Sequence, residues 1–263
     1  MSAPKRFSCA VVTGASSGIG LELCRLLAPR CTILLVVARR LDRLQSLAGE
    51  ISPQGCLVHC IQADLEVAGG ANDLWSRIID KGFSPDLFVN NAGFGLYGNS
   101  LELPLQRELA MVELNISSLL VLTKLAASQM AKGGGGTVLN LASVAAFQPG
   151  PRMATYFATK SFVLSYSQAL NEELCARGVR VLALCPGNTS TAFHTVAGTT
   201  RVKAMQKMFA MEAKSVARQG IRQIDSGKSV WIPGLLNQAM VLIVGLLPRK
   251  WVTHLSGQVL RAD

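Results

Sequence analysis

Short runs of apolar residues alternate along the chain with longer stretches in which apolar residues recur every three or four positions. Two of the longer stretches are IGLELCRLLAP and LPLQRELAMVELNISSLLVLTKLAASQMA, which we expect to be helices. The short runs are SCAVVTG (8–14), TILLVVA (32–38), GCLVHCIQA (55–63), DLFVNNAG (86–93), GTVLNLAS (136–143), VRVLALCPG (179–187) and SVWIPG (229–234). Strands that are apolar on both faces and alternate with helices are typical of a parallel sheet covered on each side. The pattern therefore predicts an α/β fold with about seven parallel strands.

The chain is long enough to bury one large core, because it has 263 residues of which 49% are apolar. No linker, repeat or low-complexity tract divides it, so we expect a single domain over residues 1–263. The first apolar run meets a glycine-rich turn too soon to be a secretory segment, and we interpret it as the first strand.

The last long apolar stretch, LLNQAMVLIVGLLP at 235–248, contains Asn237, Gln238 and Gly245. It is too short to span a bilayer easily, so we expect no transmembrane segment. A helix that packs on the core or docks on a surface is favoured, and this leaves a weak contact with a membrane surface open.

Seven cysteines without regular spacing indicate free thiols in a reducing compartment, and we therefore expect a cytoplasmic protein. Cys56, His59 and Cys60 invite interpretation as a metal site. On a continuous strand, however, their side chains alternate between the two faces instead of converging. We interpret these residues as structural and predict no metal site.

The whole chain has a net charge of +10, and much of its positive charge is concentrated in one stretch. Residues 201–228 hold seven basic residues against Glu212 and Asp225; the basic ones are Arg201, Lys203, Lys207, Lys214, Arg218, Arg222 and Lys228. No aromatic residues interleave with them as in a nucleic-acid interface, so we expect no nucleic-acid partner. A solvated helix face is favoured, and attraction of an anionic substrate or partner is the alternative.

A glycine-rich turn, TGASSGIG, joins the first predicted strand to a helix. Gly14, Gly18 and Gly20 would let the backbone turn tightly and approach a pyrophosphate, and the helix N-terminus would offer unpaired N–H groups to it. In parallel sheets, ligands bind at the carboxyl ends of the strands, where this turn lies. By itself the turn is equally compatible with a purely structural role.

The segment YFATK places Tyr156 and Lys160 four residues apart, so their side chains share one face of a helix. Taken alone, this spacing is also that of an ordinary solvated pair.

Further motifs follow the later strands: Asn90-Asn91-Ala92-Gly93, Ser143, and Pro186-Gly187 with Thr191; Asn115 interrupts the apolar face of the long helix. Together with TGASSGIG and YFATK, in this order, they closely resemble the single-domain short-chain dehydrogenase/reductase family over roughly residues 8–234. The resemblance implies a Rossmann-type, doubly wound fold with helices on both faces of the sheet. It also implies a nicotinamide cofactor, hydride transfer between an alcohol and a carbonyl, and a homodimer or homotetramer.

In this family the residues that match Tyr156 act as general acid or base, and those that match Lys160 lower its pKa and hold the nicotinamide ribose. Lowering a phenol pKa from about 10 to about 7 requires roughly 4 kcal/mol. One cation about 4 Å away supplies roughly that much at an effective dielectric constant near 20. The resemblance also implies that Ser143 binds the substrate oxygen and that Asn115 holds a water that connects Lys160 to solvent.

The second predicted strand ends with Ala38, Arg39 and Arg40, where an acid would select NAD. Arg39 can form a bidentate contact with the 2′-phosphate, so we predict NADP(H). Asp42 is the nearest acid, and we expect it inside the next helix. Arg39 and Arg40 at the start of a solvated helix are the alternative.

The remaining cofactor contacts are implied motif by motif. Asp64 matches the family's adenine-pocket acid, with a helix N-cap as the alternative, and we expect Asn90 to border the adenosine. The full set of expected cofactor residues is Gly14, Ser16, Ser17, Gly18, Ile19, Gly20, Arg39, Arg40, Asp64, Leu65, Asn91, Ala92, Gly93, Tyr156, Lys160, Pro186, Gly187, Thr189 and Thr191.

Residues 192–214 fall where the family places its substrate lid, and the tail from about 235 to 263 lies outside the motifs. We expect Met205, Met208, Phe209 and Met211 to form a pliable apolar wall for a medium-sized, largely apolar ketone or alcohol. His194 either faces the pocket or is structural. Two other functions stay open: a 3-oxoacyl-[acyl-carrier-protein] reductase that docks an acidic carrier on 201–228, and a non-catalytic NADPH sensor.

Overall fold

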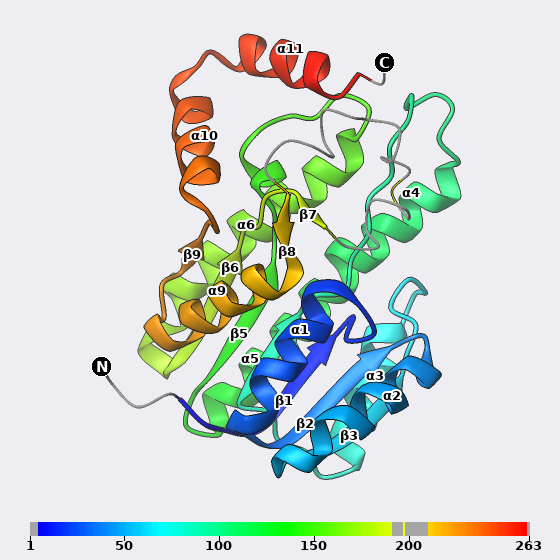
Figure 1. Cartoon of the computed structure of the whole chain (residues 1–263), viewed down its shortest axis with the longest axis vertical. Helices are drawn as coiled ribbons and strands as arrows, with labels where there is room; N and C mark the ends of the chain where they lie inside the picture. The colour runs from blue at the N-terminus through cyan, green and yellow to red at the C-terminus, as the bar shows by residue number, and fades with distance from the viewer. Residues whose placement is uncertain (1–4, 191–196, 198–209, 262–263) are drawn as a thin grey trace.

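Seven parallel strands form the central sheet of the computed structural model, which describes residues 5–190, 197 and 210–261 (Figure 1). Their order across the sheet is β3-β2-β1-β4-β5-β6-β9. The strands are β1 (Phe7–Thr13), β2 (Cys31–Ala38), β3 (Leu57–Gln62), β4 (Leu87–Asn90), β5 (Gly136–Leu141), β6 (Val179–Leu184) and β9 (Val230–Trp231). The predicted α/β fold with a parallel sheet of seven strands is therefore confirmed.

Helices cover both faces of this sheet, as Figure 1 shows. One face carries α1 (Gly18–Leu27), α2 (Leu41–Ile51) and α9 (Ala213–Ser226). The other face carries α3 (Gly70–Asp80), α5 (Leu119–Lys132) and α6 (Ala154–Leu174). Short 3₁₀ turns lie at Ala28–Arg30, Ser52–Gln54, Val144–Phe147 and Cys175–Arg177. This arrangement is doubly wound, and it places the loops after β1, β4, β5 and β6 at one edge of the sheet.

The strands end earlier than the apolar runs that predicted them. β4 ends at Asn90, β5 at Leu141 and β6 at Leu184, so the motif residues that follow lie in loops at the carboxyl edge. The last strand shrinks to two residues, because Pro233 has no N–H with which to extend the ladder. A second, two-stranded sheet of β7 (Thr189–Ser190) and β8 (Met211–Glu212) was not expected.

The helical run Leu105–Lys132 is long and apolar enough to cross a membrane, by length and composition alone. It consists of α4 (Leu105–Val112), a π-helical segment (Glu113–Ser118) and α5. Leu122, Ala126 and Met130 on α5 are buried in the hydrophobic cluster that also contains the β-strand residue Phe88. We therefore assign this run to the folded core.

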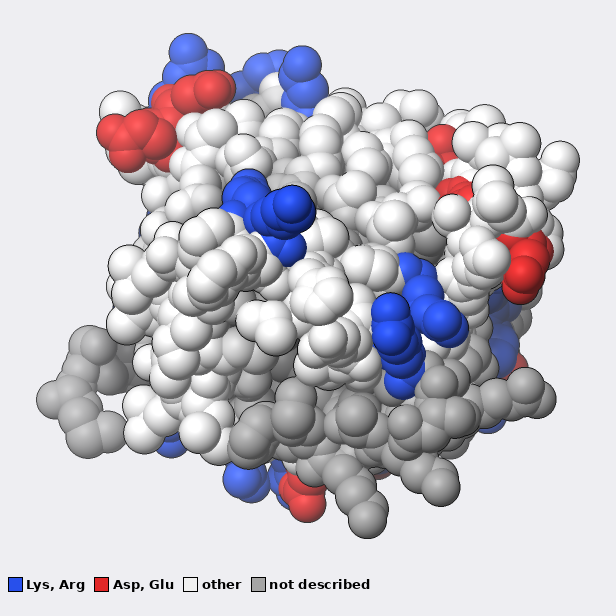
Figure 2. Space-filling view, turned by 90° about the horizontal axis from the view of Figure 1, so that it is seen from above, with Lys and Arg blue, Asp and Glu red and all other residues white. Residues whose placement is uncertain are grey.

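Helices α10 (Leu235–Leu246) and α11 (Arg249–Val259) lie beyond the carboxyl edge of the sheet (Figure 1). The hydroxyl of Tyr97 donates a 2.7 Å hydrogen bond to the carbonyl of Leu260, which ties the end of α11 to the loop after β4. Seen from above, this end of the molecule carries few charged side chains (Figure 2). Only Asn237 of α10 is buried, so this helix lies on the surface and is not packed in the core.

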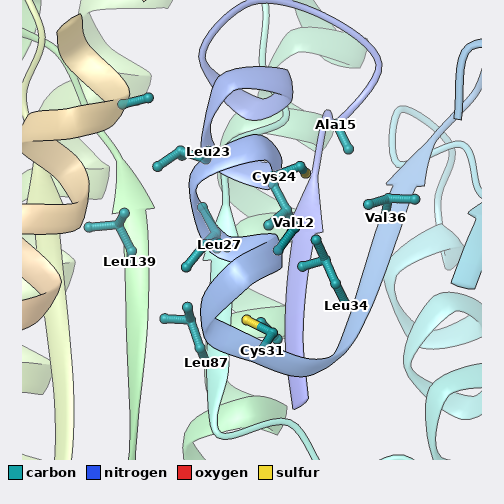
Figure 3. Close-up of a cluster of buried hydrophobic side chains, with 14 of the residues drawn as sticks. Val12, Ala15, Leu23, Cys24, Leu27, Cys31, Leu34, Val36, Leu87 and Leu139 are labelled. Carbon is teal, nitrogen blue, oxygen red and sulfur yellow. The ribbon is translucent and has the colours of Figure 1, made fainter. Parts of the chain in front are cut away.

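The core is split by the sheet into two layers, because neighbouring strand residues point to opposite faces. Leu34 and Val36 of β2 face α1 and α2, whereas Leu35 and Val37 face α3 and α5. Figure 3 shows the first layer, in which Leu23 and Leu27 of α1 project toward the sheet. All of these side chains are almost fully buried, and each contributes about 1.5–3 kcal/mol through apolar burial.

The seven cysteines are all free thiols. His59 lies on β3, and its ring centroid is 4.8 Å from that of Phe83. Within the described ranges, no group of three or more His, Cys, Asp or Glu side chains is placed to hold a metal ion.

Candidate active site

The glycine-rich turn between β1 and α1 leaves no room for larger side chains. Gly14 has φ +67°, and a Cβ added there would lie 2.6 Å from Nδ2 of Asn91. A Cβ at Gly20 would clash with the same Asn91 amide and with the Gly14 carbonyl. At the start of α1, Ser17 makes no side-chain cap and no acid occupies the first turn. The free N–H groups of this helix start therefore suit an anionic pyrophosphate.

Asn91 joins the loop after β4 to this turn. Its Nδ2 donates to the carbonyl of Thr13 at 2.9 Å and to that of Gly14 at 3.3 Å. The hydroxyl of Thr13 in turn accepts hydrogen bonds from the backbone N–H groups of Asn91 and Ala92, at 3.0 and 3.1 Å. The turn and the loop are thus held as one rigid unit, a role of Thr13 that the motif comparison did not predict.

Asn90 does not border this site, so the expectation that it contacts the adenosine is wrong. It is 3% exposed, and its Nδ2 donates to Oγ1 of Thr123 and to Oδ1 of Asn140, both at 2.9 Å. The physical reason is the alternation of a strand: Asn91 faces the turn, so Asn90 faces the opposite layer.

Arg39 and Arg40 lie at the end of β2, on the wall of the same cavity. Nη1 of Arg39 pairs with Oε1 of Glu66 at 2.6 Å, and Glu66 also pairs with Arg107 at 3.2 Å. Nη2 of Arg40 donates to Oγ of Ser16 at 3.1 Å. Asp42 lies inside α2, as expected. The two guanidinium groups therefore line the cavity close to the glycine-rich turn.

Asp64 also lines the cavity, and its Oδ1 accepts a 2.9 Å hydrogen bond from the backbone N–H of Glu66. It is not a helix N-cap, because α3 begins at Gly70.

Asn115 lies in the π-helical segment, one of the irregularities that often occur at functional sites. Its amide bridges Phe94 and Thr159: Oδ1 accepts from Phe94 N–H at 3.2 Å, and Nδ2 donates to Phe94 C=O at 2.9 Å and to Thr159 Oγ1 at 3.1 Å. A Cβ at Gly93 would be 3.0 Å from Oδ1 of Asn115 and 3.6 Å from Nζ of Lys160. Glycine at position 93 therefore makes room for both side chains.

Tyr156 and Lys160 lie one turn apart near the start of α6, as the YFATK spacing predicts. Nζ of Lys160 is 5.8 Å from the centroid of the Tyr156 ring and donates a 2.7 Å hydrogen bond to the carbonyl of Leu141, at the end of β5. Oγ of Ser143 accepts a 3.1 Å hydrogen bond from the N–H of Ala145. The Ser143 side chain is also hydrogen-bonded to that of Tyr156. The three side chains therefore line the same cavity.

The pKa of Tyr156 moves in the opposite direction from that expected. Burial raises the pKa of this phenol to about 12, and the hydrogen bond with Ser143 only partly offsets the effect. Burial also lowers the pKa of Lys160 to about 8. The physical cause is desolvation, because burial penalises the charged form of each group.

Thr189 follows Pro186 and Gly187 on the opposite wall, where its Oγ1 donates to the carbonyl of Gly187 at 3.0 Å. A Cβ at Gly187 would lie 2.5 Å from the side-chain amide of Asn237. This contact brings α10 against the loop after β6, whose residues are among the expected cofactor contacts.

These elements surround one cavity of about 700 Å³. Of the expected residues, Gly20 and Asn115 lie behind its wall, and Thr191 falls outside the described residues. All the others line it, namely Gly14, Ser16, Ser17, Gly18, Ile19, Arg39, Arg40, Asp64, Leu65, Asn91, Ala92, Gly93, Ser143, Tyr156, Lys160, Pro186, Gly187 and Thr189.

The C-terminal helices supply a part of the wall that the motifs did not predict. Asn237, Met240 and Val244 of α10 line the cavity, as do Val252 and Leu255 of α11. The apolar stretch at 235–248 was the only sequence feature that pointed to them. They make the outer end of the cavity largely apolar.

The predicted lid and the basic stretch are only partly described. His194, Met205, Met208 and Phe209 lie outside the described residues, and so do Arg201, Lys203 and Lys207. Met211 is a β8 residue that packs on the hydrophobic core and does not line the cavity, so its predicted place in the substrate wall is wrong. The described basic residues, Lys214, Arg218, Arg222 and Lys228, are exposed, as expected for a solvated face.

The family model for short chain dehydrogenase matches residues 8–201, about three quarters of the chain. The chain therefore belongs to the short-chain dehydrogenase family. This identifies it as an oxidoreductase, and the glycine-rich turn, the open start of α1 and the two arginines fit the nicotinamide cofactor that the family uses. The fold and the family predicted from the motifs are both confirmed.

Two relatives illustrate the range of similar enzymes. Human 17-beta-hydroxysteroid dehydrogenase type 3 is 32% identical over 253 residues, which cover 93% of this chain and 80% of the relative. The 3-oxoacyl-[acyl-carrier-protein] reductase of Synechocystis is 31% identical over 183 residues, which cover 69% of this chain and 74% of the relative.

Two solved structures are similar over almost the whole chain. A short-chain dehydrogenase from Sphingobium yanoikuyae in complex with NADPH has a TM-score of 0.80 and 29% identity, and the match covers 92% of this chain and 97% of that structure. The bulky-bulky ketone specific alcohol dehydrogenase from Comamonas testosteroni has a TM-score of 0.75 and 29% identity, with coverage of 92% and 95%.

Proposed function

We propose that this short-chain dehydrogenase is an NADP(H)-dependent carbonyl reductase and alcohol dehydrogenase that acts on largely apolar ketones and secondary alcohols. The observation that carries the proposal is that Tyr156, Ser143 and Lys160 line one cavity, which begins at the glycine-rich turn. When bound, the nicotinamide supplies or accepts the hydride, and the side chains of this chain handle the proton.

In this proposal Tyr156 is the general acid and Ser143 binds the carbonyl oxygen. A phenol whose pKa is raised to about 12 keeps its proton at neutral pH, so it is ready to donate that proton to an oxygen that gains negative charge. The hydroxyl of Ser143 and the ammonium of Lys160 stabilise the same developing charge. These features favour carbonyl reduction over alcohol oxidation near neutral pH.

The preference for NADP(H) is argued from Arg39 and Arg40. Both line the cavity beyond the glycine-rich turn, and a planar guanidinium matches the 2′-phosphate in a bidentate way. Glu66 partly neutralises Arg39. Arg40, by contrast, donates hydrogen bonds to the uncharged hydroxyl groups of Ser16 and Ser17. The Sphingobium relative, which binds NADPH, supports this preference.

The substrate class is argued from the outer end of the cavity. Met240 and Val244 of α10, Leu247 directly after it, and Val252 of α11 form an apolar wall there. Such a wall suits a bulky apolar substrate with few polar groups. The names of the human steroid dehydrogenase and of the Comamonas bulky-ketone enzyme point in the same direction.

The decisive test is NADPH oxidation across a panel of ketones and aldehydes. We expect bulky apolar ketones to be reduced with the highest kcat/KM, and NADH to be used at least about tenfold less well, a difference of about 1.4 kcal/mol. Tyr156→Phe should lower kcat by about 10²–10⁴-fold and leave the Kd for NADPH unchanged, because only the proton donor is removed.

Three results would contradict the proposal. Equal rates with NADH and NADPH would contradict the proposed preference for NADP(H). A panel in which only small polar sugars react would contradict the proposed class of apolar substrates. Cofactor binding with no turnover of any carbonyl would favour a non-catalytic NADPH-binding protein.

The second candidate is a 3-oxoacyl thioester reductase, which the Synechocystis relative and the exposed Lys214, Arg218 and Arg222 on α9 favour. In that case acetoacetyl thioesters would react far faster than simple ketones. The rate with a carrier-bound substrate would also collapse as salt is raised, because docking would depend on charge.

We also propose a homo-oligomer in the cytoplasm. Leu105 and Leu109 on α4 are 61% and 57% exposed, which suits a contact between the long helices of two chains. The free thiols suit a reducing compartment. Sedimentation at several concentrations tests the first statement, and localisation of a tagged chain tests the second.

A further inference from the structure

The outward faces of α10 and α11 are unusually apolar. Of the fourteen large hydrophobic side chains that are exposed in the described residues, eight lie on these two helices. They are Leu235, Leu236, Leu242, Ile243 and Leu246 on α10, and Trp251, Leu255 and Val259 on α11. We call these eight residues the apolar cap surface.

The spacing shows that α10 is apolar on two faces, one of which the protein does not cover. Leu235, Leu242 and Leu246 share the outward stripe, whereas Met240 and Val244 line the cavity. A helix that is hydrophobic all round is normally buried. In α11, Trp251, Leu255 and Val259 are four residues apart and form a second outward stripe.

Between Val230 and Arg261, the segment that holds the apolar cap surface, the charged residues that are present are basic. Arg249, Lys250 and Arg261 are exposed, and the sequence from Val230 to Arg261 contains no Asp or Glu. Figure 2 shows this end of the molecule: most of it is uncharged, Lys and Arg side chains interrupt its middle, and the Asp and Glu side chains in view lie toward its margins.

We propose that the apolar cap surface docks onto an anionic phospholipid bilayer. Helices with an apolar face flanked by basic residues bind in the interface of such bilayers, and the basic residues are attracted by the negative lipid headgroups. Trp251, 63% exposed, is of the residue type that concentrates at the headgroup level. The twelve residues of α10 extend only about 18 Å, so the helix lies in the interface and does not span about 30 Å of hydrocarbon.

The position of the cavity gives this docking a consequence for the substrate. Leu255 and Val259 belong to the apolar cap surface and also line the cavity. An apolar ketone dissolved in the bilayer therefore reaches the cavity beside these two side chains without crossing water. This step rests on the proposed apolar substrate, whereas the docking itself does not.

A second copy of the chain is a less suitable occupant of the same surface. A two-fold contact would bring the patch against itself. Arg249, Lys250 and Arg261 would then face their own equivalents, with no acidic residue of the segment Val230–Arg261 to pair with them. Anionic lipid headgroups supply the missing negative charge.

The test is flotation of the full chain with vesicles of phosphatidylcholine alone or with about 30% phosphatidylserine. We expect the chain to float with the anionic vesicles, and Leu242→Glu to lower the partition constant at least about tenfold. The expected loss is large because a carboxylate replaces an apolar group in the interface. Leu242 does not line the cavity, so the variant should still bind NADPH and reduce a water-soluble ketone at the normal rate.

Two matched controls separate this surface from general stickiness and charge. Leu57→Glu changes a leucine that is 57% exposed at the start of β3, at the opposite edge of the sheet, and should float like the unmodified chain. Lys250→Gln should weaken flotation with anionic vesicles several-fold, whereas Lys132→Gln at the end of α5 should not. Bromine-labelled lipids should quench the fluorescence of Trp251, and the quenching should disappear in Trp251→Phe.

The proposal is overturned if the unmodified chain does not float with anionic vesicles, or if Leu57→Glu weakens flotation as much as Leu242→Glu. It is also overturned if flotation is absent and sedimentation shows a dimer that Leu242→Glu dissociates, since a second copy of the chain would then occupy the surface. Normal docking together with failure of the carbonyl panel would overturn the proposed function and leave the docking proposal supported.

Discussion

In the central sheet Leu34 is fully buried, whereas in α10 Leu242 is 68% exposed, although both belong to strongly apolar segments. Leu34 is covered by helices on its face of the sheet. Leu242 has no such cover within the described part of the chain, and the inner side of its helix is occupied by the cavity. The same residue type therefore serves folding in one region, while in the other it is available for contacts outside the chain.

The two regions therefore differ in what they contribute: the central sheet to the stability of the fold, and helices α10 and α11 to the substrate end of the cavity. The sheet and its two helical layers hold the glycine-rich turn, Ser143, Tyr156 and Lys160 in place. Helices α10 and α11 close the outer end of the cavity with few buried side chains of their own. Substitutions in the first region should act mainly on the free energy of unfolding, and those in the second on binding.

The largest contrast is expected for truncation of one leucine in each region. Leu34→Ala should lower the free energy of unfolding by about 2–5 kcal/mol, because it leaves a cavity in the packed layer. Leu242→Ala should change it by no more than about 0.5 kcal/mol. Urea titrations followed by circular dichroism measure both values. Similar losses in the two variants would show that the chain covers α10 in solution.

A smaller contrast is expected for two buried asparagines. Asn90→Ala should cost about 1–3 kcal/mol in the free energy of unfolding, because it removes the hydrogen bonds that Asn90 donates to Thr123 and Asn140 in the core. It should not change the Kd for NADPH, since Asn90 does not line the cavity.

Asn237→Ala serves as the counterpart in α10. This side chain donates a local 2.6 Å hydrogen bond to the carbonyl of Pro233 and lines the cavity. Its replacement should affect the KM for bulky ketones more than the free energy of unfolding. A loss of NADPH affinity in Asn90→Ala that exceeds the loss in Asn237→Ala would contradict the assignment.

The pH dependence of kcat/KM tests the role of the Lys160 ammonium, which lines the cavity. Burial lowers the pKa of Lys160 to about 8, so the ammonium is present below pH 8 and is lost as the pH rises. Tyr156, with its pKa raised to about 12, keeps its proton over this range. The kcat/KM for NADPH-driven reduction should therefore fall above pH 8, by up to about tenfold per pH unit.

Lys160→Arg provides the control, because a guanidinium stays charged throughout this range. Its residual activity should show no fall between pH 7 and 10. A rate of the unmodified enzyme that rises from pH 8 to 10 would contradict the role of the ammonium in reduction.

The smallest effect is expected at Glu66, whose carboxylate pairs with Arg39 at 2.6 Å. The 2′-phosphate has to compete with this carboxylate for the guanidinium. The Arg39 side chain is 58% exposed, so solvent screens the pair and limits its contribution to about 0.5–1 kcal/mol. Glu66→Gln should therefore tighten NADPH binding about two- to fivefold and leave NADH binding unchanged. Asp73→Asn, which removes a similar partner from Arg77 on α3, is the matched control. Weaker NADPH binding in Glu66→Gln would show that the carboxylate positions Arg39 for the phosphate.

The number of strands and the gathering of the strand-end residues were largely predictable, because a parallel sheet brings the carboxyl ends of its strands to one edge. Seven apolar runs gave seven strands, and the loops after β1, β4, β5 and β6 meet around one cavity. The error at Asn90 was avoidable, since strand alternation alone separates it from Asn91.

Other features depend on burial, which no local pattern reveals. The raised pKa of Tyr156 follows from burial by side chains that are distant in sequence. The π-helical segment around Asn115 reflects packing against the loop after β4, through Phe94. The apolar stretch at 235–248 predicted a helix, but it carried no information on which of its two apolar faces meets the cavity.

The hydrogen bond from Tyr97 to the carbonyl of Leu260 has a practical consequence for preparing the protein. A purification tag fused directly after this segment would be attached next to Leu260, which lines the cavity and borders the apolar cap surface. A tag fused ahead of Lys5, by contrast, is attached beside the first strand, at the far edge of the sheet. Enzyme assays and vesicle experiments are therefore best run with the fusion at the amino-terminal side.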